Sequence, residues 1–390
     1  MPIRIMCGYP RASFISLEEN NFLNTFATTR INLIVLAAVA LALLASAGCG
    51  ASASHLGFVA LRGSNGIAVY RINNHSAAFT SIVGSPFTTG LSPSAVVAHP
   101  SKSFLYVANQ TENDISLFKI DSHSGVLNEV LPRTQTGIFP SSMAMDSGGT
   151  LLYVANQASN SISAYAIASG TGALTPVTGS PFPAGPSPTR LRIPPSGKFL
   201  YVLSGNLSSI YAYSIVSGGT LQAVPGSPFV VGPTPSSFAI DPAEHFLYVT
   251  NASASTVSVF TINSSSGALA AIPQSPFTTT TTASSTLPVD VVAGPSSQFL
   301  YVLNSSTNNI SEYSIGSNGN LTLLTNSPVS ATGTGPAFLL LDSTGNFLFV
   351  GNQGSNNINV FSVGSDGTLT SNGQSSPAVS ASPSSMSVLP

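Results

Sequence analysis

The sequence predicts an all-β fold in which one unit of four short strands is repeated seven times. Three observations predict it: an aromatic-Val pair recurs at nearly constant spacing, strand-like segments surround every copy, and the two chain ends supply complementary parts of one unit. Subtracting neighbouring positions gives spacings of 48, 47, 48, 47, 53 and 48 residues. The aromatic residues are Phe58, Tyr106, Tyr153, Tyr201, Tyr248, Tyr301 and Phe349.

Each unit contains four segments typical of strands. The aromatic residue lies in one, and a β-branched residue nine positions later opens the next, as in "VSVFTI" from Val257. A third segment begins with Pro thirteen positions before the aromatic residue, where a missing N–H is tolerated. A fourth follows and usually ends in "SPF", as at Ser85 and Ser180. The long interval contains the insertion 278–286, which we expect to be a surface loop.

The chain ends predict that the units close into a ring. The first unit lacks the Pro-led strand, because Cys49 to Leu56 is too short to hold one. The chain finishes with "PSSMSVLP" from Pro383. This segment matches the Pro-led strand, but the other three strands of a unit do not follow it. Repeated four-stranded units of this length are typical of a β-propeller. We therefore predict a seven-bladed β-propeller over residues 57–390, with antiparallel blades and the C-terminal strand completing the first blade.

The first 49 residues have the features of an export signal. Arg30 precedes an apolar run that reaches small residues and then Cys49. "SAGC" resembles the lipobox of bacterial lipoproteins, in which the Cys is lipidated, although Ser46 stands where Leu is usual. An ordinary signal peptide and an uncleaved anchor are the alternatives. We expect a signal peptide over 1–49 and a linker over 50–56. We also expect the mature protein to be a monomer in the bacterial cell envelope, attached to the membrane only through lipid on Cys49.

Composition excludes several classes of function. Only 6% of residues are charged, with 11 Lys and Arg against 13 Asp and Glu, and no Lys or Arg follows Lys198. Nucleic-acid binding requires clustered basic residues, so no nucleic-acid partner is expected. The five His residues show no metal-ligand spacing, and no nucleophile motif is present. We expect neither a metal nor a cofactor.

The repeated motif carries a family resemblance. With "YVTN" at Tyr248 and "YVAN" at Tyr106 and Tyr153, residues 57–390 resemble the YVTN-repeat propellers, whose relatives include lactonases similar to 6-phosphogluconolactonase. The resemblance implies a ligand near the central channel, on the face where loops enter the innermost strands. It also implies Arg and His just after the Pro of some innermost strands. Only Arg190 fits that pattern here, which speaks against lactone hydrolysis.

Residues shared by most units are expected to be structural, whereas exceptions mark a site for an asymmetric ligand. Asn251 and its four equivalents recur three positions after the aromatic residue, which indicates turn chemistry. Two positions after the Pro, by contrast, the residues are Ala95, Ser142, Arg190, Ser237, Asp290, Phe338 and Ser385.

Arg190 and Asp290 are therefore the first site candidates. Each is a charge on an innermost strand, and such a charge is costly unless it is solvated or paired. Either they form a structural ion pair or are simply solvated, or Arg190 anchors a carboxylate or carbonyl oxygen while Asp290 accepts a hydrogen bond or acts as a general base. Arg62, Glu112 and Asp114 are secondary ligand-binding candidates, in loops expected on the same face.

Two functions follow from these features. The first is a binding or scaffolding module of the cell envelope that engages a small polar ligand, a polymer or another protein. The second is a hydrolase that opens an unphosphorylated lactone at the central channel. The missing His pattern and sparse charge favour the first, and the family resemblance favours the second.

Overall fold

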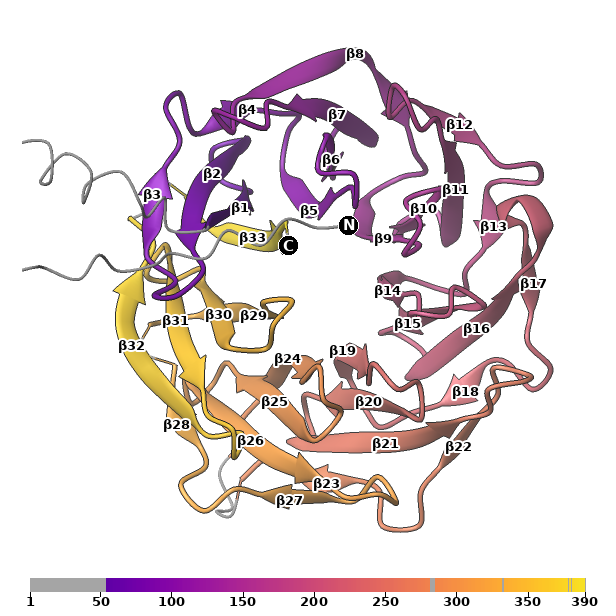
Figure 1. The fold of residues 1–390 in the computed structure, drawn as a ribbon. Helices are drawn as coiled ribbons and strands as arrows, with labels where there is room; N and C mark the ends of the chain where they lie inside the picture. The colour runs from indigo at the N-terminus through magenta and orange to yellow at the C-terminus, as the bar shows by residue number, and fades with distance from the viewer. Residues whose placement is uncertain (1–53, 281–284, 332, 378, 380, 390) are drawn as a thin grey trace, which may run out of the picture. The chain divides into compact units, whose positions relative to one another are not determined.

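Seven antiparallel sheets surround a central channel in the computed structural model, which describes residues 54–280, 285–331, 333–377, 379 and 381–389 (Figure 1). The predicted seven-bladed propeller is confirmed. We number the blades 1 to 7 in the order of their aromatic residues, from Phe58 to Phe349. Within the described residues, the one helical element is a short 3-10 turn over Ser217–Gly219.

The innermost strand of each blade begins at the predicted Pro. The second strand of the blade pairs with it in an antiparallel ladder, which has a register shift beside the Pro. From blade 1 to blade 7 the innermost strands are β33 (Pro383–Val388), β5 (Pro93–Ala98), β9 (Pro140–Met145), β14 (Pro188–Arg192), β19 (Pro235–Ile240), β24 (Pro288–Ala293) and β29 (Pro336–Leu341).

The second strand carries the aromatic residue and is buried on both faces, because blades pack against each of its sides. The second strands are β1 (Ser54–Leu61), β6 (Phe104–Asn109), β10 (Leu151–Asn156), β15 (Phe199–Ser204), β20 (Phe246–Asn251), β25 (Phe299–Asn304) and β30 (Phe347–Asn352). The third strands are β2 (Gly66–Asn73), β7 (Asp114–Ile120), β11 (Ser161–Ile167), β16 (Ser209–Ile215), β21 (Thr256–Ile262), β26 (Asn309–Ile315) and β31 (Asn357–Val363).

The outer position differs between blades in a way the sequence explains. In the five blades with a Ser-Pro-Phe or Ser-Pro-Val segment it is split into two short strands, and the Ser hydroxyl accepts a backbone N–H of the third strand, as Ser275 does from Val259 (2.9 Å). The split strands are β3 (Phe79–Ser81) with β4 (Phe87–Thr88), β12 (Leu174–Pro176) with β13 (Phe182–Pro183), β17 (Leu221–Ala223) with β18 (Phe229–Val230), β22 (Leu269–Ala271) with β23 (Phe277–Thr278), and β27 (Leu321–Leu323) with β28 (Val329–Ser330). Blades 2 and 7 have one continuous outer strand, β8 (Leu127–Gln135) and β32 (Leu369–Ser375).

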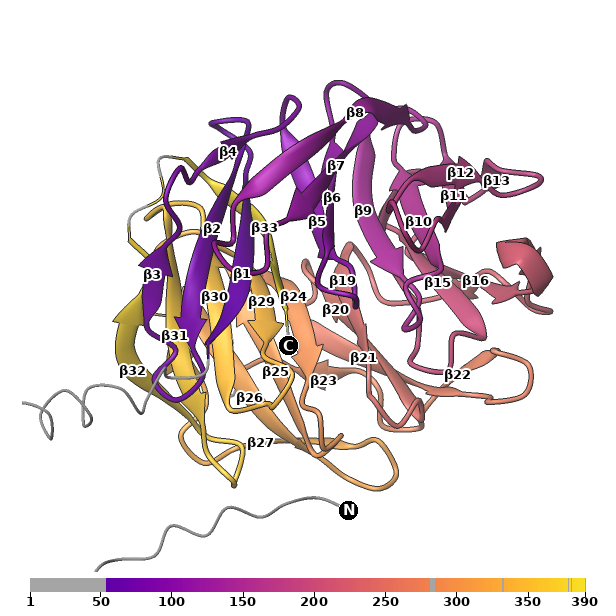
Figure 2. The same ribbon diagram turned by 45° about the horizontal axis from the view of Figure 1, so that its top comes forward.

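The ring is closed as predicted. β33 pairs antiparallel with β1, from Gly57 opposite Val388 to Leu61 opposite Pro383. In the tilted view, β33 lies on the channel side of β1, and β2 and β3 follow outward (Figure 2). β1 begins at Ser54, inside the range 50–56 that the sequence assigned to a linker, because Ser54 to Leu56 continue the ladder with β2. Pairing of the two ends leaves no open inner sheet edge in blade 1.

The repeated Asn is structural, as expected, but its hydrogen-bond partners lie on the third strand rather than within the turn. Asn251 is fully buried, and its Nδ2 donates to the hydroxyls of Thr256 (3.0 Å) and Ser258 (2.9 Å) on the third strand. The side chain thus ties the second strand to the third across the turn. Blades 1 and 4 lack this Asn and also lack the second partner, having Ala68 and Tyr211 in the place of Ser258.

A second repeated contact joins neighbouring blades. The hydroxyl of Tyr201 donates to the carbonyl oxygen of Gly267 in the next blade (2.9 Å), and Tyr106, Tyr153 and Tyr301 make the equivalent bond. Gly267 has a φ of +75°, which Gly adopts without steric cost. In these four blades the aromatic residue that defines the repeat is therefore a tether to the next blade.

Candidate central-channel site

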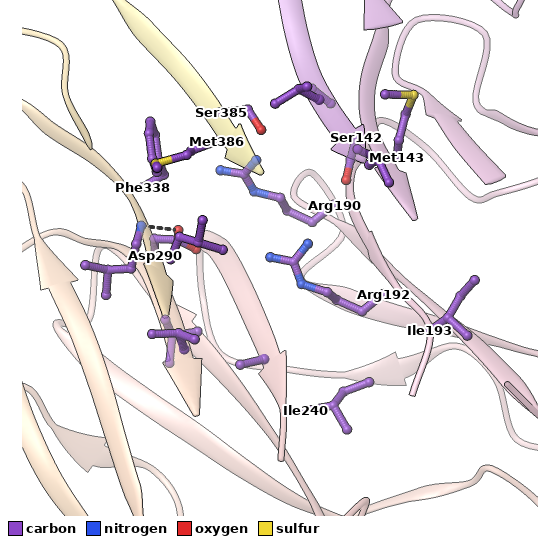
Figure 3. Close-up of a pocket in the computed structure, with 18 of the residues that line it drawn as sticks. Ser142, Met143, Arg190, Arg192, Ile193, Ile240, Asp290, Phe338, Ser385 and Met386 are labelled. Carbon is purple, nitrogen blue, oxygen red and sulfur yellow. Dashed lines mark hydrogen bonds between the residues drawn. The ribbon is translucent and has the colours of Figure 1, made fainter. Parts of the chain in front are cut away.

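A cavity of about 400 Å³ lies in the channel and is lined by residues of all seven innermost strands (Figure 3). This volume is within the range of small-ligand pockets. The cavity is where the family resemblance implied a ligand, at the innermost strands. Its lining includes the two first candidates, Arg190 and Asp290.

Hydrogen bonds between blades set the innermost strands at one level. The hydroxyl of the Ser that follows the Pro donates to the carbonyl of the next blade's Pro, as Ser236 does to Pro288 (2.6 Å). Ser94, Ser141 and Ser384 make the same bond to Pro140, Pro188 and Pro93. This contact explains the first Ser of the "PSS" sequences. At these four blade boundaries, equivalent positions of neighbouring strands consequently lie at about the same depth in the channel.

Asp290 is part of the wall. Its side chain is only 4% exposed, and its two oxygens accept hydrogen bonds from the Ser237 hydroxyl (2.6 Å) and the Leu339 N–H (2.8 Å). Those partners belong to the two neighbouring blades, 5 and 7. Ser142 makes a similar contact, since its hydroxyl accepts the Leu191 N–H (3.2 Å). Asp290 therefore connects three blades, and its buried charge is stabilised by two donors.

Arg190 and Arg192 are the cations of the cavity. Both belong to β14, two positions apart, so their side chains leave the same face of the strand. Figure 3 shows both guanidinium groups reaching from β14 into the cavity, on the side facing Asp290 and Phe338. Within the described residues, neither guanidinium makes a hydrogen bond or ion pair, and every ion pair that the structure contains there is made by Arg133.

Arg192 was not among the sequence-predicted site residues. The blades were compared two positions after the Pro, whereas Arg192 stands four positions after it. The other blades have Val97, Ala144, Ala239, Val292, Leu340 and Ser387 there. Comparing this second position would have found Arg192 as its one charged residue, because alternate residues of a strand share a face.

The electrostatics of the cavity favour an anion. Burial lowers the pKa of Arg192, the nearby charge of Arg190 lowers it further, and the carboxylate of Asp290 raises it. Arginine nevertheless stays protonated, because its ordinary pKa is far above neutrality. Among the lining residues the ionisable groups are these two cations and one carboxylate. One positive charge therefore remains uncompensated within the cavity.

Deeper in the channel the lining is apolar. Val292 and Leu340 line the cavity at the level of Arg192. Ile193, Ile240 and Ala293, one position later in their blades, also line it and pack against the hydrophobic clusters between blades. At this last position all seven blades have an apolar residue: Ala98, Met145, Ile193, Ile240, Ala293, Leu341 and Val388. The cavity thus combines a charged level, nearer the Pro ends of the strands, with an apolar level beyond it.

The secondary candidates lie elsewhere. Arg62, in the turn between β1 and β2, donates to the Gln110 side chain (2.6 Å). Glu112 and Asp114 belong to blade 2, where Arg133 of the outer strand forms ion pairs with Glu112 (2.5 Å) and Asp114 (3.9 Å). None of the three lines the cavity. The structure brings Arg190 and Asp290 together and separates these three residues from them.

The structure gives no positive sign of a metal site. No group of three His, Cys, Asp or Glu side chains suitable for a metal ion occurs among the described residues. Over the same residues, no helix is both long and apolar enough to cross a bilayer. The predicted signal peptide and Cys49 lie outside the described residues.

Fold and cavity together define a class: a seven-bladed β-propeller with a cationic cavity at its centre. A model of the family "Lactonase, 7-bladed beta-propeller" matches residues 64–189, 177–283 and 272–387. The chain belongs to this lactonase family. No curated protein matches the chain significantly.

Solved structures support the fold. A putative 6-phosphogluconolactonase from Bacteroides fragilis is 21% identical, covers 88% of this chain and 99% of its own, and has a TM-score of 0.75. A putative 6-phosphogluconolactonase from Bacteroides uniformis is 19% identical, covers 86% and 99%, and also has a TM-score of 0.75. The periplasmic gluconolactonase PpgL of Pseudomonas aeruginosa is 20% identical, covers 87% and 99%, and has a TM-score of 0.73.

Proposed function

We propose that the protein is an exported binding module of the cell envelope whose central cavity holds a small carboxylate-bearing ligand on Arg190 and Arg192. One observation supports this most strongly: two guanidinium groups reach into one cavity without a described hydrogen-bond or ion-pair partner. Guanidinium groups donate paired hydrogen bonds that match a carboxylate. An anion placed there would neutralise the uncompensated charge.

Isothermal titration calorimetry of the purified protein tests this proposal. Gluconate and octanoate serve as probes. Both carry a carboxylate, but the rest of gluconate is polar and the rest of octanoate is apolar. At least one should bind, and Arg190→Gln or Arg192→Gln should weaken it roughly 10- to 100-fold, since a hydrogen bond to a charged group contributes about 1.5–3 kcal/mol. Lys119→Gln is the matched control, because it removes one exposed positive charge from the third strand of blade 2. The proposal fails if neither probe binds, or if all three variants weaken binding equally.

The second candidate function is hydrolysis of an unphosphorylated lactone. Membership of the lactonase family favours it, and Asp290 lies in the same cavity as the arginines. In such a reaction Asp290 would take a proton from water while an arginine stabilises the developing oxyanion. Both Asp290 oxygens already accept hydrogen bonds, and among the residues that the structure describes no His, Cys, Glu or Lys lines the cavity. The cavity therefore favours binding over turnover.

Lactone turnover by the purified protein separates the two functions. Hydrolysis of gluconolactone that is lost in both Arg190→Ala and Asp290→Asn would establish the hydrolase. No turnover, together with arginine-dependent carboxylate binding, would establish the binding module.

The envelope location rests on the leader sequence and on one neighbour described as periplasmic. We infer that Cys49 carries the lipid. Cys49→Ala should then move the protein from the membrane fraction to the soluble fraction. A Cys49→Ala protein that still sediments with membranes would disprove the lipid anchor.

A further inference from the structure

The lining of the cavity leaves few polar side chains for a ligand. The hydroxyls of Ser94, Ser141 and Ser384 donate to backbone carbonyls, and that of Ser142 accepts a backbone N–H. Among the described lining residues, the polar side chains that make no hydrogen bond with the protein are the two arginines and Ser385, and each oxygen of Asp290 already accepts one donor.

This shortage selects against a polyhydroxylated body. A sugar acid carries a hydroxyl on nearly every carbon, and a buried hydroxyl without a hydrogen bond costs about 1–3 kcal/mol. The arginines can satisfy the carboxylate and a neighbouring hydroxyl, but the side chains at the level of Arg192 and one position beyond it are Val292, Leu340, Ile193, Ile240 and Ala293. Those side chains satisfy no hydroxyl and gain free energy from covering methylene groups.

We propose that the ligand is an amphipathic carboxylate, with its head on Arg190 and Arg192 and an apolar body along the deeper level of the channel. This proposal rests on the carboxylate site proposed above and specifies its ligand class. The arrangement of the lining carries it: the two arginines of β14 share one cavity with the apolar residues Ile193, Ile240 and Ala293, which come one position later after the Pro of their strands, so one elongated molecule can contact both.

A chain-length series tests the proposal on the unmodified protein. In calorimetric titrations with butyrate, hexanoate and octanoate, affinity should rise roughly fourfold per methylene, which is the gain for burying one such group. Octanoate should bind more tightly than gluconate. Affinity independent of chain length, or gluconate as the tighter ligand, would overturn the amphipathic ligand class while leaving the carboxylate site intact. Absence of binding by every probe would overturn both proposals.

Ile240→Asn tests the apolar level directly. Ile240 is half-buried on β19 and lines the cavity, so a polar side chain there should weaken octanoate roughly tenfold and butyrate much less. Val83→Asn is the matched control, because Val83 is 89% exposed outside the channel, and it should change neither affinity. Equal weakening of octanoate and butyrate by Ile240→Asn would count against the proposal. Thermal melting of both variants checks their folding, and the chain-length series stands if Ile240→Asn does not fold.

Discussion

The N–H of Leu339 donates to the carboxylate of Asp290 across the boundary between blades 6 and 7, at 2.8 Å. This hydrogen bond distinguishes the roles of two residues that occupy equivalent positions in the sequence repeat. Asp290 and Arg190 are both unusual charges at the same position of their strands, yet Asp290 is engaged in the wall and Arg190 is available to a ligand. The bond thus gives the carboxylate a structural role, whereas the guanidinium of Arg190 remains the proposed ligand contact.

Asp290→Ala should lower the free energy of unfolding by about 3 kcal/mol, because it leaves the Leu339 N–H and the Ser237 hydroxyl without their buried acceptor. Asp290→Asn should cost far less. Its amide oxygen can accept from Leu339, and its NH₂ can donate to the Ser237 hydroxyl. Chemical denaturation of the two variants measures the difference. Equal stability of Asp290→Ala and the unmodified protein would show that these bonds do not hold the blades.

Asp290→Asn should also strengthen carboxylate binding roughly threefold, because it removes a negative charge that acts on Arg192. Calorimetry with octanoate measures the change. Weaker binding in Asp290→Asn would show that the carboxylate of Asp290 supports binding rather than opposing it, and would contradict this prediction.

Asn251 and Ser258 should be energetically coupled. Asn251→Ala removes a fully buried amide that donates to two third-strand hydroxyls, and it should cost about 2 kcal/mol of unfolding free energy. A double-mutant cycle with Ser258→Ala should give a coupling energy of about 1 kcal/mol. Asn109 and Ser116 form the equivalent pair in blade 2 and provide a replicate. A coupling energy near zero in both blades would refute the tether between the second and third strands.

Glu312 should make stability fall as the pH rises. Its side chain is 1% exposed in β26, it accepts the Leu369 N–H (2.7 Å), and burial raises its pKa. A raised folded-state pKa means that the folded protein holds a proton that the unfolded chain releases. The associated stability is complete below the unfolded-state value of about 4.5 and is lost as the pH rises through the folded-state pKa.

Glu312→Gln keeps the acceptor for Leu369 and removes the ionisation. The variant should therefore be more stable than the unmodified protein at neutral pH, and the difference should shrink toward pH 4. Thermal melting across this range measures it. A difference that does not vary with pH would contradict the assigned direction.

The sequence predicts the architecture well because repetition averages out local ambiguity. The aromatic-Val pair, the Pro and the "SPF" segment each recur in register, so seven blades and the closing strand from Pro383 follow from spacing alone. The sequence predicts that the repeated Asn has a structural role, but it does not predict which groups the Asn side chain bonds to. Its acceptors are side chains five and seven residues later, and their role depends on strand pairing.

The candidate site was harder to predict because its contacts join residues of different blades. Nothing local to Asp290 shows that Ser237 and Leu339 supply its donors, since they lie 53 and 49 residues away. Arg192 was visible in the sequence but lay outside the position that was compared. Glu112 and Asp114 were placed near the channel by loop position, and their partner Arg133 lies on the outer strand of blade 2.

A crystal structure of the protein with bromine-tagged octanoate tests the central claim most directly, because anomalous scattering locates the bromine. The account predicts the carboxylate between Arg190 and Arg192 and the bromine among the apolar residues around Ile193 and Ile240. A ligand bound in the opposite orientation, or bound outside the channel while both arginines stay without an anion, would contradict it.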